Sequence, residues 1–169
     1  HLESWTLMTA LATATERLRI GTLVLCNSYR NPALLAKMAS TLDVVSNGRL
    51  ELGLGAGWMD EEYRGYGYHF PSVRVRIEQL EEGLEVIRRL FGESRSTFQG
   101  KYYALDDAPN NPKAVQTPAP PITIGGAGEQ HGGQRQEAAL VAAGRVANPG
   151  DEAEQGKGAE VAPIAEAGA

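Results

Sequence analysis

Hydrophobic positions along the chain follow two alternating spacings, one typical of helices and one typical of buried strands. Three segments carry apolar residues at steps of three or four, as amphipathic helices do: residues 2–14, 31–47 and 73–91. Three short apolar runs are typical of strands buried on both faces: residues 22–26, 49–55 and 121–125. Helices and strands therefore alternate, and this order predicts an α/β fold with a parallel sheet and crossover helices, either an open sheet or part of a (β/α)8 barrel.

Local signals place the ends of the predicted helices. Asn31 is a suitable N-cap, and Pro32 suits the first helical position because its missing N–H has no partner there. Asn47-Gly48 and Gly92 are typical helix stops. The apolar faces are predicted to be Leu2, Trp5, Met8, Leu11 and Ala12, then Leu34, Leu35, Met38, Leu42 and Val45, then Val73, Ile77, Leu80, Leu84, Ile87 and Leu90.

The remaining segments have weaker patterns. Residues 58–70 are rich in aromatic residues and glycine and indicate a loop with one helical turn. Residues 96–105 predict a hairpin that turns at Gln99-Gly100. Residues 106–121 indicate a proline-rich loop. From residue 130 onward the chain is rich in Ala, Gly, Glu and Gln, and we expect one short helix over 135–143 and disorder beyond about residue 147.

Composition narrows the classes of function. The 169 residues suit one domain, and a net charge of -5 gives no basic face for nucleic acid. The chain has no apolar run near the roughly 20 residues of a membrane span and no signal peptide, so we expect a cytoplasmic protein. The single cysteine, Cys26, excludes an internal disulfide and a cysteine-based zinc site. The three histidines lie far apart, and we expect no metal.

Glycines cluster after two of the predicted strands. Gly53, Gly55 and Gly57 lie at and beyond the end of one strand, and Gly125, Gly126 and Gly128 at and beyond the end of another. The G-x-G-x-G spacing differs from the dinucleotide-binding G-x-G-x-x-G, and no helix starts directly after it. Two interpretations stay open: close packing of helices on the strand, or close approach of the backbone to a flat ring or a phosphate. Carboxyl ends of parallel strands bind ligands in barrels and open sheets, so two such clusters favour a ligand.

Few side chains suggest a catalytic role. Cys26 ends a strand and is typical of a small buried hydrophobe. Glu61 and Glu62 suit either an acid–base pair or the first turn of a helix. The aromatic residues of the 58–70 loop suit either a pocket lining or packing beneath the loop; these are Tyr63, Tyr66, Tyr68 and Phe70. We assign no catalytic residue.

Long stretches of the sequence resemble one family. They are "TERLRIGTLVLCNSYRNPALLAKMASTLDVVSNGRLELGLGAGWMDEEYRGYGYHF", "FQGKYYAL" and "PPITIGGAGE", in this order. They resemble the bacterial-luciferase-like flavin monooxygenases and deazaflavin-dependent oxidoreductases from about residue 2 to 129. The resemblance implies a fragment of a (β/α)8 TIM barrel with about three parallel strands. It also implies coenzyme F-420 or FMN at the carboxyl ends of the strands, a small-molecule substrate, and a homodimer if the full barrel exists.

The resemblance also implies site residues. Leu23-Val24 matches a position at which family members often have a non-proline cis peptide beneath the cofactor ring. Cys26 matches a position that contacts the ring or its ribityl chain. Ala56, Gly57 and Glu61 match a loop that touches the cofactor. The expected phosphate-binding turn consists of Gly125, Gly126 and Gly128.

The sequence departs from the family at both ends. A (β/α)8 barrel takes about 250 residues, and the sequence begins at what corresponds to the helix after the second strand. We therefore divide the chain into a barrel fragment, residues 1–129, and a low-complexity tail, residues 130–169, whose composition is typical of a shifted reading frame in GC-rich DNA. Unpaired sheet edges make such a fragment marginal, and we expect the 169 residues to bind either cofactor weakly or not at all; clear micromolar binding would contradict this.

Three functions follow: two are enzymes of the same class, and the third is a non-enzyme. The first is the middle portion of a coenzyme F-420-dependent oxidoreductase that transfers a hydride between the deazaflavin ring and a small organic substrate, with a preference for this branch from residues 17–58. The second is an FMN-dependent luciferase-like monooxygenase, which differs because reduced flavin enzymes consume oxygen. The third is a non-enzyme, either an inactive remnant or a protein that only binds the cofactor. The sequence identifies no substrate.

Overall fold

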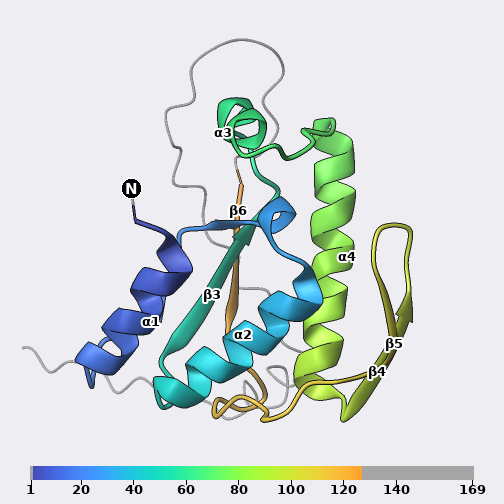
Figure 1. The fold of residues 1–169 in the computed structure, drawn as a ribbon. Helices are drawn as coiled ribbons and strands as arrows, with labels where there is room; N and C mark the ends of the chain where they lie inside the picture. Colours follow the sequence, from blue (N-terminus) through green and yellow to red (C-terminus); the bar gives the residue numbers. More distant parts are fainter. Residues whose placement is uncertain (1, 127–169) are drawn as a thin grey trace, which may run out of the picture.

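The computed structural model describes residues 2–126, drawn as a ribbon in Figure 1. Its helices are α1 (Ser4–Ala14), the 3-10 helix η1 (Asn27–Tyr29), α2 (Pro32–Val45), α3 (Asp60–Gly65) and α4 (Val73–Gly92). Its strands are β1 (Ile20–Gly21), β2 (Leu25–Cys26), β3 (Leu50–Gly55), β4 (Arg95–Gln99), β5 (Ala104–Pro109) and β6 (Ile122–Gly125). Gly128, the predicted helix over 135–143 and the rest of the predicted tail lie outside the described residues.

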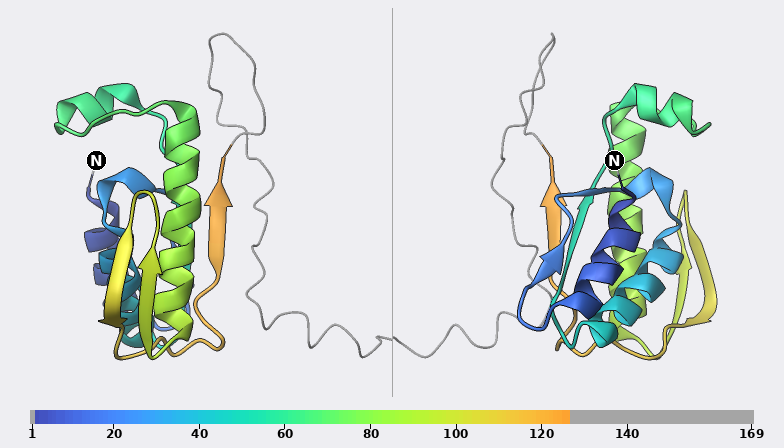
Figure 2. Two further views of the ribbon diagram at one scale, coloured as in Figure 1. Left: turned by 90° about the vertical axis from the view of Figure 1, so that its right-hand side faces the viewer. Right: turned by 60° about the vertical axis from the view of Figure 1, so that its left-hand side comes forward.

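A parallel sheet centred on β3 organises the fold. Strands β1 and β2 pair with one part of β3 each, and β6 pairs with β3 from Leu52 to Gly55, all in parallel. Leu50, Leu52 and Leu54 are buried, and they belong to the core formed with helices α1, α2 and α4. Figure 2 shows these helices on one side of the strands. The α/β fold with three parallel strand positions is confirmed, with β1 and β2 together filling one position.

The predicted strand over residues 22–26 is interrupted in the structure. Ile20 pairs with Leu50 and Leu25 pairs with Leu54, so five steps along the β1–β2 segment correspond to four along β3. One extra residue per register shift is the definition of a β-bulge. The Leu23–Val24 peptide bond within this segment is cis, as the family resemblance led us to expect. An apolar run of five residues does not reveal such an interruption, which is why the sequence predicted one continuous strand.

The helix ends agree with the sequence signals. The Asn31 side chain accepts hydrogen bonds from the backbone N–H groups of Ala33 and Leu34, so it caps α2 as predicted. Asn47 and Gly48 both have positive φ, 54° and 76°, and end that helix. Within residues 2–126 no helix is both long and apolar enough to cross a membrane.

The buried faces of the helices differ from the predicted faces. Six members of the predicted faces are exposed: Leu2, Leu11, Leu34, Val45, Val73 and Ile77. In α2 the fully buried positions include Ala36 and Ala39, whose small side chains allow close contact with neighbouring elements. In α4 Arg76 is buried, and its guanidinium donates to the carbonyl oxygens of Gly57 and Pro71, which compensates its loss of water. The helical spacing of apolar residues alone therefore assigned too many large apolar side chains to the buried faces.

The hairpin of β4 and β5 lies on the outer side of α4, away from the parallel sheet (Figure 2). Phe98 pairs with Leu105 and Gln99 with Ala104, so the predicted hairpin is confirmed. Its turn lies at residues 100–103 rather than at Gln99-Gly100, because Gln99 is still paired in the strand. β5 continues to Pro109, and the first residues of the predicted proline-rich loop are therefore strand.

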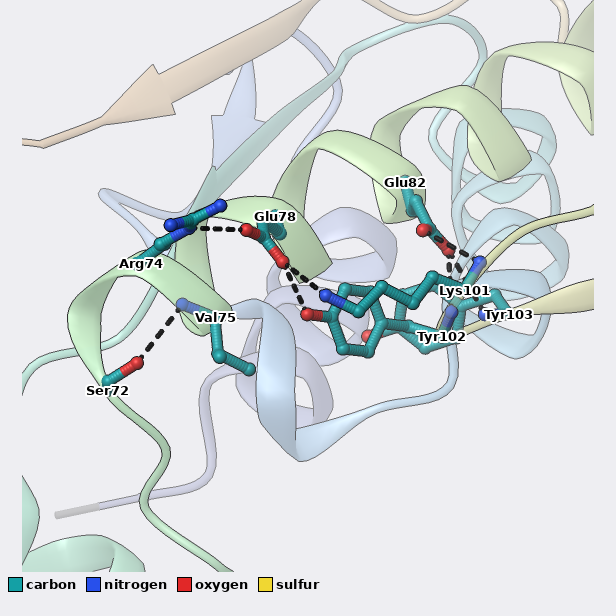
Figure 3. Close-up of polar contacts among 8 residues, drawn as sticks. All are labelled: Ser72, Arg74, Val75, Glu78, Glu82, Lys101, Tyr102 and Tyr103. Carbon is teal, nitrogen blue, oxygen red and sulfur yellow. Dashed lines mark hydrogen bonds and ion pairs between the residues drawn. The ribbon is translucent and has the colours of Figure 1, made fainter.

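A carboxylate of α4 holds the tip of this hairpin. Glu82 accepts hydrogen bonds from the backbone N–H groups of Lys101, Tyr102 and Tyr103 at 2.9, 2.9 and 3.2 Å (Figure 3). One turn earlier, Glu78 accepts from the Lys101 ammonium at 2.9 Å and from the Tyr102 hydroxyl at 2.6 Å. The tip is thus attached to α4 by backbone and side chain together.

The hairpin attachment predicts a pH-dependent stability. Burial acts to raise the pKa of Glu82, but the three backbone N–H groups outweigh it and lower this pKa. A lowered folded-state pKa means that the stabilisation is present above the ordinary value near 4.5 and is lost as pH falls below it. We expect Glu82→Gln to lower the melting temperature by roughly 2 to 4 °C at pH 7 and by less at pH 3.

Thermal unfolding of both proteins at the two pH values measures this difference. Glu81→Gln is the matched control, because Glu81 is the exposed neighbour of Glu82 on the same helix. A deficit in Glu82→Gln that stays constant from pH 7 to pH 3 would contradict the prediction.

Candidate functional site

The carboxyl ends of β2, β3 and β6 meet at one edge of the sheet. Cys26 pairs with Gly55, and Gly55 pairs with Gly125, so these three residues lie side by side at the strand ends. Ala56 and Gly57 follow directly on β3, and the short helix α3 lies beyond that end (Figure 1). The structure therefore brings together most of the residues expected to bind a cofactor. Gly128 lies outside the described residues.

The glycines of β3 and β6 make room for the bulge. A Cβ on Gly55 would lie 2.9 Å from the Val24 Cγ2, and a Cβ on Gly125 would lie 2.6 Å from the same atom. A Cβ on Gly53 would collide with the carbonyl oxygen of Thr22. These glycines face away from the buried leucines of β3, so close helix packing, one of the two interpretations left open, does not explain them. The bulge covers the glycines, and Leu23 on it is 78% exposed.

Gly57 has a different neighbourhood. Its φ is 82°, and a Cβ there would lie 2.6 Å from the Cys26 Sγ and even closer to the Tyr63 hydroxyl. The Cys26 Sγ and the Tyr63 hydroxyl are hydrogen-bonded at 3.0 Å, and the Tyr63 hydroxyl donates to the Ser28 Oγ at 2.8 Å. Gly57 is thus required by protein packing, and Cys26 is only half-buried rather than fully buried.

Tyr63 is neutral at ordinary pH. Its side chain is fully buried, and this burial, followed by the hydrogen bond shared with the Cys26 Sγ, raises its pKa to about 12. The hydroxyl therefore stays protonated and acts as a hydrogen-bond donor rather than as a base. Burial also raises the pKa of Tyr29, with a further contribution from its hydrogen bond to Glu62.

Three aromatic residues of the 58–70 segment, which includes α3, form a packed cluster with Tyr29: Tyr63, Tyr68 and Phe70. Tyr63 contacts Phe70 and Tyr29 edge-on or tilted, with ring centroids 4.8 and 4.9 Å apart, and Tyr29 stacks on Tyr68 at 4.7 Å. The Arg76 guanidinium lies over the Phe70 ring at 4.1 Å. Of the two interpretations, packing holds for these rings, whereas Tyr66 is 76% exposed.

The acidic pair and the second glycine cluster have clear positions. Glu61 and Glu62 lie in the first turn of α3 with Asp60, where negative charge is favourable, so the helix-turn interpretation describes them. Glu61 is exposed. Gly125 ends β6, and no atom of the described chain lies within 4 Å of a Cβ placed on Gly126. Gly126 is therefore open to a neighbouring group.

Sequence reasoning missed residues that follow β2 directly. Ser28 receives the Tyr63 hydrogen bond, Tyr29 belongs to the aromatic cluster, and the Asn27 side chain is buried. The available signal was position: residues just after a parallel strand lie at its carboxyl end, and these three follow Cys26. Among the described residues, no titratable group here has the arrangement of a catalytic acid or base.

The model of the family described as luciferase-like monooxygenase matches residues 1–169. The chain belongs to this family. Relatives within the family carry names of dehydrogenases and monooxygenases. The match includes residues 130–169, whereas the stretches that resemble the family in the sequence end near residue 129. The division of the chain into a barrel fragment and a tail at that residue stays a prediction.

Curated luciferase-like relatives are similar over part of their length. The chain is 36% identical to an F420-dependent glucose-6-phosphate dehydrogenase of Amycolatopsis mediterranei over 69% of this chain and 34% of the relative. It is 38% identical to the pyrimidine monooxygenase RutA of Yersinia enterocolitica, over 70% of this chain and 32% of the relative. The chain thus spans about a third of the length of these luciferase-like relatives.

Solved luciferase-like structures share the fold. An F420-dependent secondary alcohol dehydrogenase in complex with an F420-acetone adduct superposes with a TM-score of 0.67 at 31% identity, covering 74% of this chain and 38% of that one. The coenzyme F420-dependent tetrahydromethanopterin reductase of Methanopyrus kandleri gives a TM-score of 0.67 at 22% identity, covering 75% and 39%. Together they confirm that residues 2–126 have the architecture of a luciferase-like TIM-barrel fragment.

Proposed function

We propose that the chain forms part of the cofactor site of a coenzyme F-420-dependent oxidoreductase, which transfers a hydride between the deazaflavin ring and a small organic substrate. The observation that carries the proposal is the bulge at the strand ends, where the exposed Leu23 and the adjoining Val24 lie over the glycines of β3 and β6. Support for F-420 comes from the dehydrogenase relative at 36% identity and the alcohol dehydrogenase structure at 31%.

The described residues fit a flat ring. Leu23 and Val24 supply an apolar surface, and the glycines beneath fix its height because no side chain larger than hydrogen fits there. Ala56 and the partly exposed Cys26 lie beside this surface at the strand ends, and the open Gly126 suits a phosphate-bearing chain. Gly57 contributes indirectly, through its packing on Cys26. When bound, the cofactor supplies the hydride chemistry, and the protein positions it.

Neutral hydrogen-bonding side chains order the end of β2 at this edge of the sheet. Tyr63 stays protonated because of its raised pKa, and it donates to Ser28 beside β2. A neutral apolar surface favours burial of an aromatic ring, since no charge of the protein loses water beneath it.

A luciferase-like monooxygenase that uses FMN is the second candidate. The pyrimidine monooxygenase relatives at 36 to 38% identity support it as well as the dehydrogenase supports the first. Oxygen uptake in the presence of reduced cofactor separates the two, because reduced F-420 reacts slowly with oxygen. A protein that binds neither cofactor corresponds to the remnant considered above.

We expect Leu23→Asp to weaken cofactor binding at least tenfold, which corresponds to about 1.4 kcal/mol. A carboxylate on the bulge would have to lose water against the ring. Fluorescence titration of the purified protein, as its gene encodes it, with F-420 and with FMN measures the effect.

Leu18→Asp is the matched control, because Leu18 is 63% exposed and Leu23 is 78% exposed. Leu18 precedes β1 at the opposite end of the strands. Equal affinities of wild type and Leu23→Asp, with clear binding by both, would show that the bulge is not the cofactor surface.

A further inference from the structure

Asn27, directly after Cys26 at the end of β2, inserts into the contact between η1 and α4. Its side chain is buried, with 2% exposure. The Asn27 Nδ2 donates to the Tyr103 hydroxyl at 3.1 Å and to the Gln79 carbonyl oxygen at 3.3 Å. A Cβ on Gly83 would lie 2.6 Å from the Asn27 Oδ1, so α4 carries a glycine where Asn27 approaches it. The end of β2 is therefore attached to α4 through this amide.

The partner of Asn27 belongs to the hairpin tip, far away in sequence. Tyr103 lies 76 residues after Asn27. Its backbone N–H donates to Glu82, whose carboxylate also holds the two preceding residues of the tip (Figure 3). A Cβ on Gly100 would collide with the same carboxylate, so the turn is built for this approach. Glu82 thus fixes where the Tyr103 hydroxyl lies relative to α4.

The same strand end is held from its other side by Tyr63. The Tyr63 hydroxyl contacts Cys26 and Ser28, the residues on either side of Asn27. Consecutive residues of β2 and η1 are therefore fixed in two directions. Within residues 2–126 the hairpin pairs only with itself and adds no strand to the parallel sheet. Its tip instead reaches the strand end next to the proposed cofactor surface.

We propose that Asn27, Tyr103 and Glu82 form a brace that positions Cys26 and the adjoining bulge for the cofactor. This inference rests on the proposed function. Tyr103 and Asn27 are positioning residues rather than catalytic ones, because they act on the cofactor surface through the backbone of β2. Loss of the Tyr103 hydroxyl leaves Asn27 with the longer bond to Gln79 and lets the strand end shift.

Two adjacent tyrosines of the hairpin tip provide the test. Tyr102 and Tyr103 each make a hydrogen bond through the hydroxyl, but Tyr102 bonds to Glu78 and only Tyr103 bonds to Asn27. We expect Tyr103→Phe to weaken binding of the preferred cofactor about three- to tenfold, and Tyr102→Phe to leave it unchanged. Tyr103→Phe should also shift the fluorescence maximum of the bound cofactor, which a loss of stability alone would not do.

A double-mutant cycle identifies the route of the effect. Asn27→Ala combined with Tyr103→Phe should weaken binding no more than Asn27→Ala alone, because both changes remove the same contact. If Tyr103→Phe or Asn27→Ala folds poorly, Glu82→Gln replaces it in the test. This variant loosens the hairpin tip and leaves Asn27 and Tyr103 unchanged. It should change affinity and spectrum in the same direction.

The outcomes separate the two proposals. If the full-length wild-type protein, as its gene encodes it, binds neither F-420 nor FMN, the proposed function fails and the brace has no cofactor to position. If wild type binds and Tyr103→Phe, Glu82→Gln and Tyr102→Phe all match it in affinity and spectrum, the brace is overturned and the proposed function stands.

Discussion

Asp43→Ala should lower the free energy of unfolding by about 3 to 5 kcal/mol, because this carboxylate is fully buried and holds the loop that leads into β6. The Asp43 Oδ2 accepts from the backbone N–H groups of Val115 and Gln116 at 2.8 and 2.9 Å, and the Oδ1 accepts from the Gln116 Nε2 at 2.7 Å. Removal of the carboxylate leaves three donors without their acceptor, and each partly buried donor costs about 1 to 3 kcal/mol.

The consequence reaches the strands. The Gln116 Nε2 also donates to the Leu50 carbonyl oxygen, and the Arg19 guanidinium donates to the Gln116 Oε1 at 3.0 Å. Asp43 therefore links α2 with the amino ends of β1, β3 and β6. Asp43→Asn tests the charge, since its amide keeps the shape but faces the Gln116 Nε2 with a donor unless Gln116 turns and gives up its other bonds. We expect Asp43→Asn to lower the free energy of unfolding, but by less than Asp43→Ala does.

Urea unfolding of the three proteins measures these differences. Asp106→Ala is the control, because Asp106 is exposed on β5 and such surface changes stay within about 0.5 kcal/mol. If Asp43→Ala unfolded at the same urea concentration as this control, the link between α2 and the loop would carry no stability.

Asp43 also illustrates what the sequence did not contain. The periodicity of residues 31–47 predicted α2 and its ends, and Asn31 and Gly48 confirm them. It placed Leu34 and Val45 inside, whereas Ala36, Ala39 and Asp43 are buried. Asp43 accepts a hydrogen bond from the backbone N–H of Val115, 72 residues later, and no local sequence pattern predicts a partner at that distance.

The candidate site likewise has some features that the sequence predicted and others that only the structure shows. The strand order and the glycine clusters predicted a ligand site at the carboxyl ends of the strands, and the family resemblance added Cys26 to it. The structure shows that Cys26, Gly55 and Gly125 lie side by side at that edge. The reason for the glycines came only from the structure. They fit the register shift between β1 and β2, and a register shift depends on two strands at once rather than on either sequence alone.

Gly57→Ala should lower the free energy of unfolding by about 2 to 4 kcal/mol. Its φ of 82° is unfavourable for any residue with a Cβ and costs about 1 to 2 kcal/mol. The new methyl group would also displace the Tyr63 hydroxyl and the Cys26 Sγ, and forced repacking of this kind costs about 1 to 3 kcal/mol. Urea unfolding measures the sum.

Two other glycines separate the two causes. Gly67 has a φ of 75° but no atom within 4 Å of a Cβ placed on it, so Gly67→Ala should show the backbone cost alone. Gly92 ends α4 with ordinary φ and open space, so Gly92→Ala should be neutral or stabilising by about 0.4 to 1 kcal/mol. The loss in Gly57→Ala beyond that in Gly67→Ala then belongs to the contact with Cys26 and Tyr63. Equal losses at Gly57 and Gly67 would mean that Tyr63 moves aside freely, and the hydrogen bond between Tyr63 and Cys26 would then not fix the end of β2.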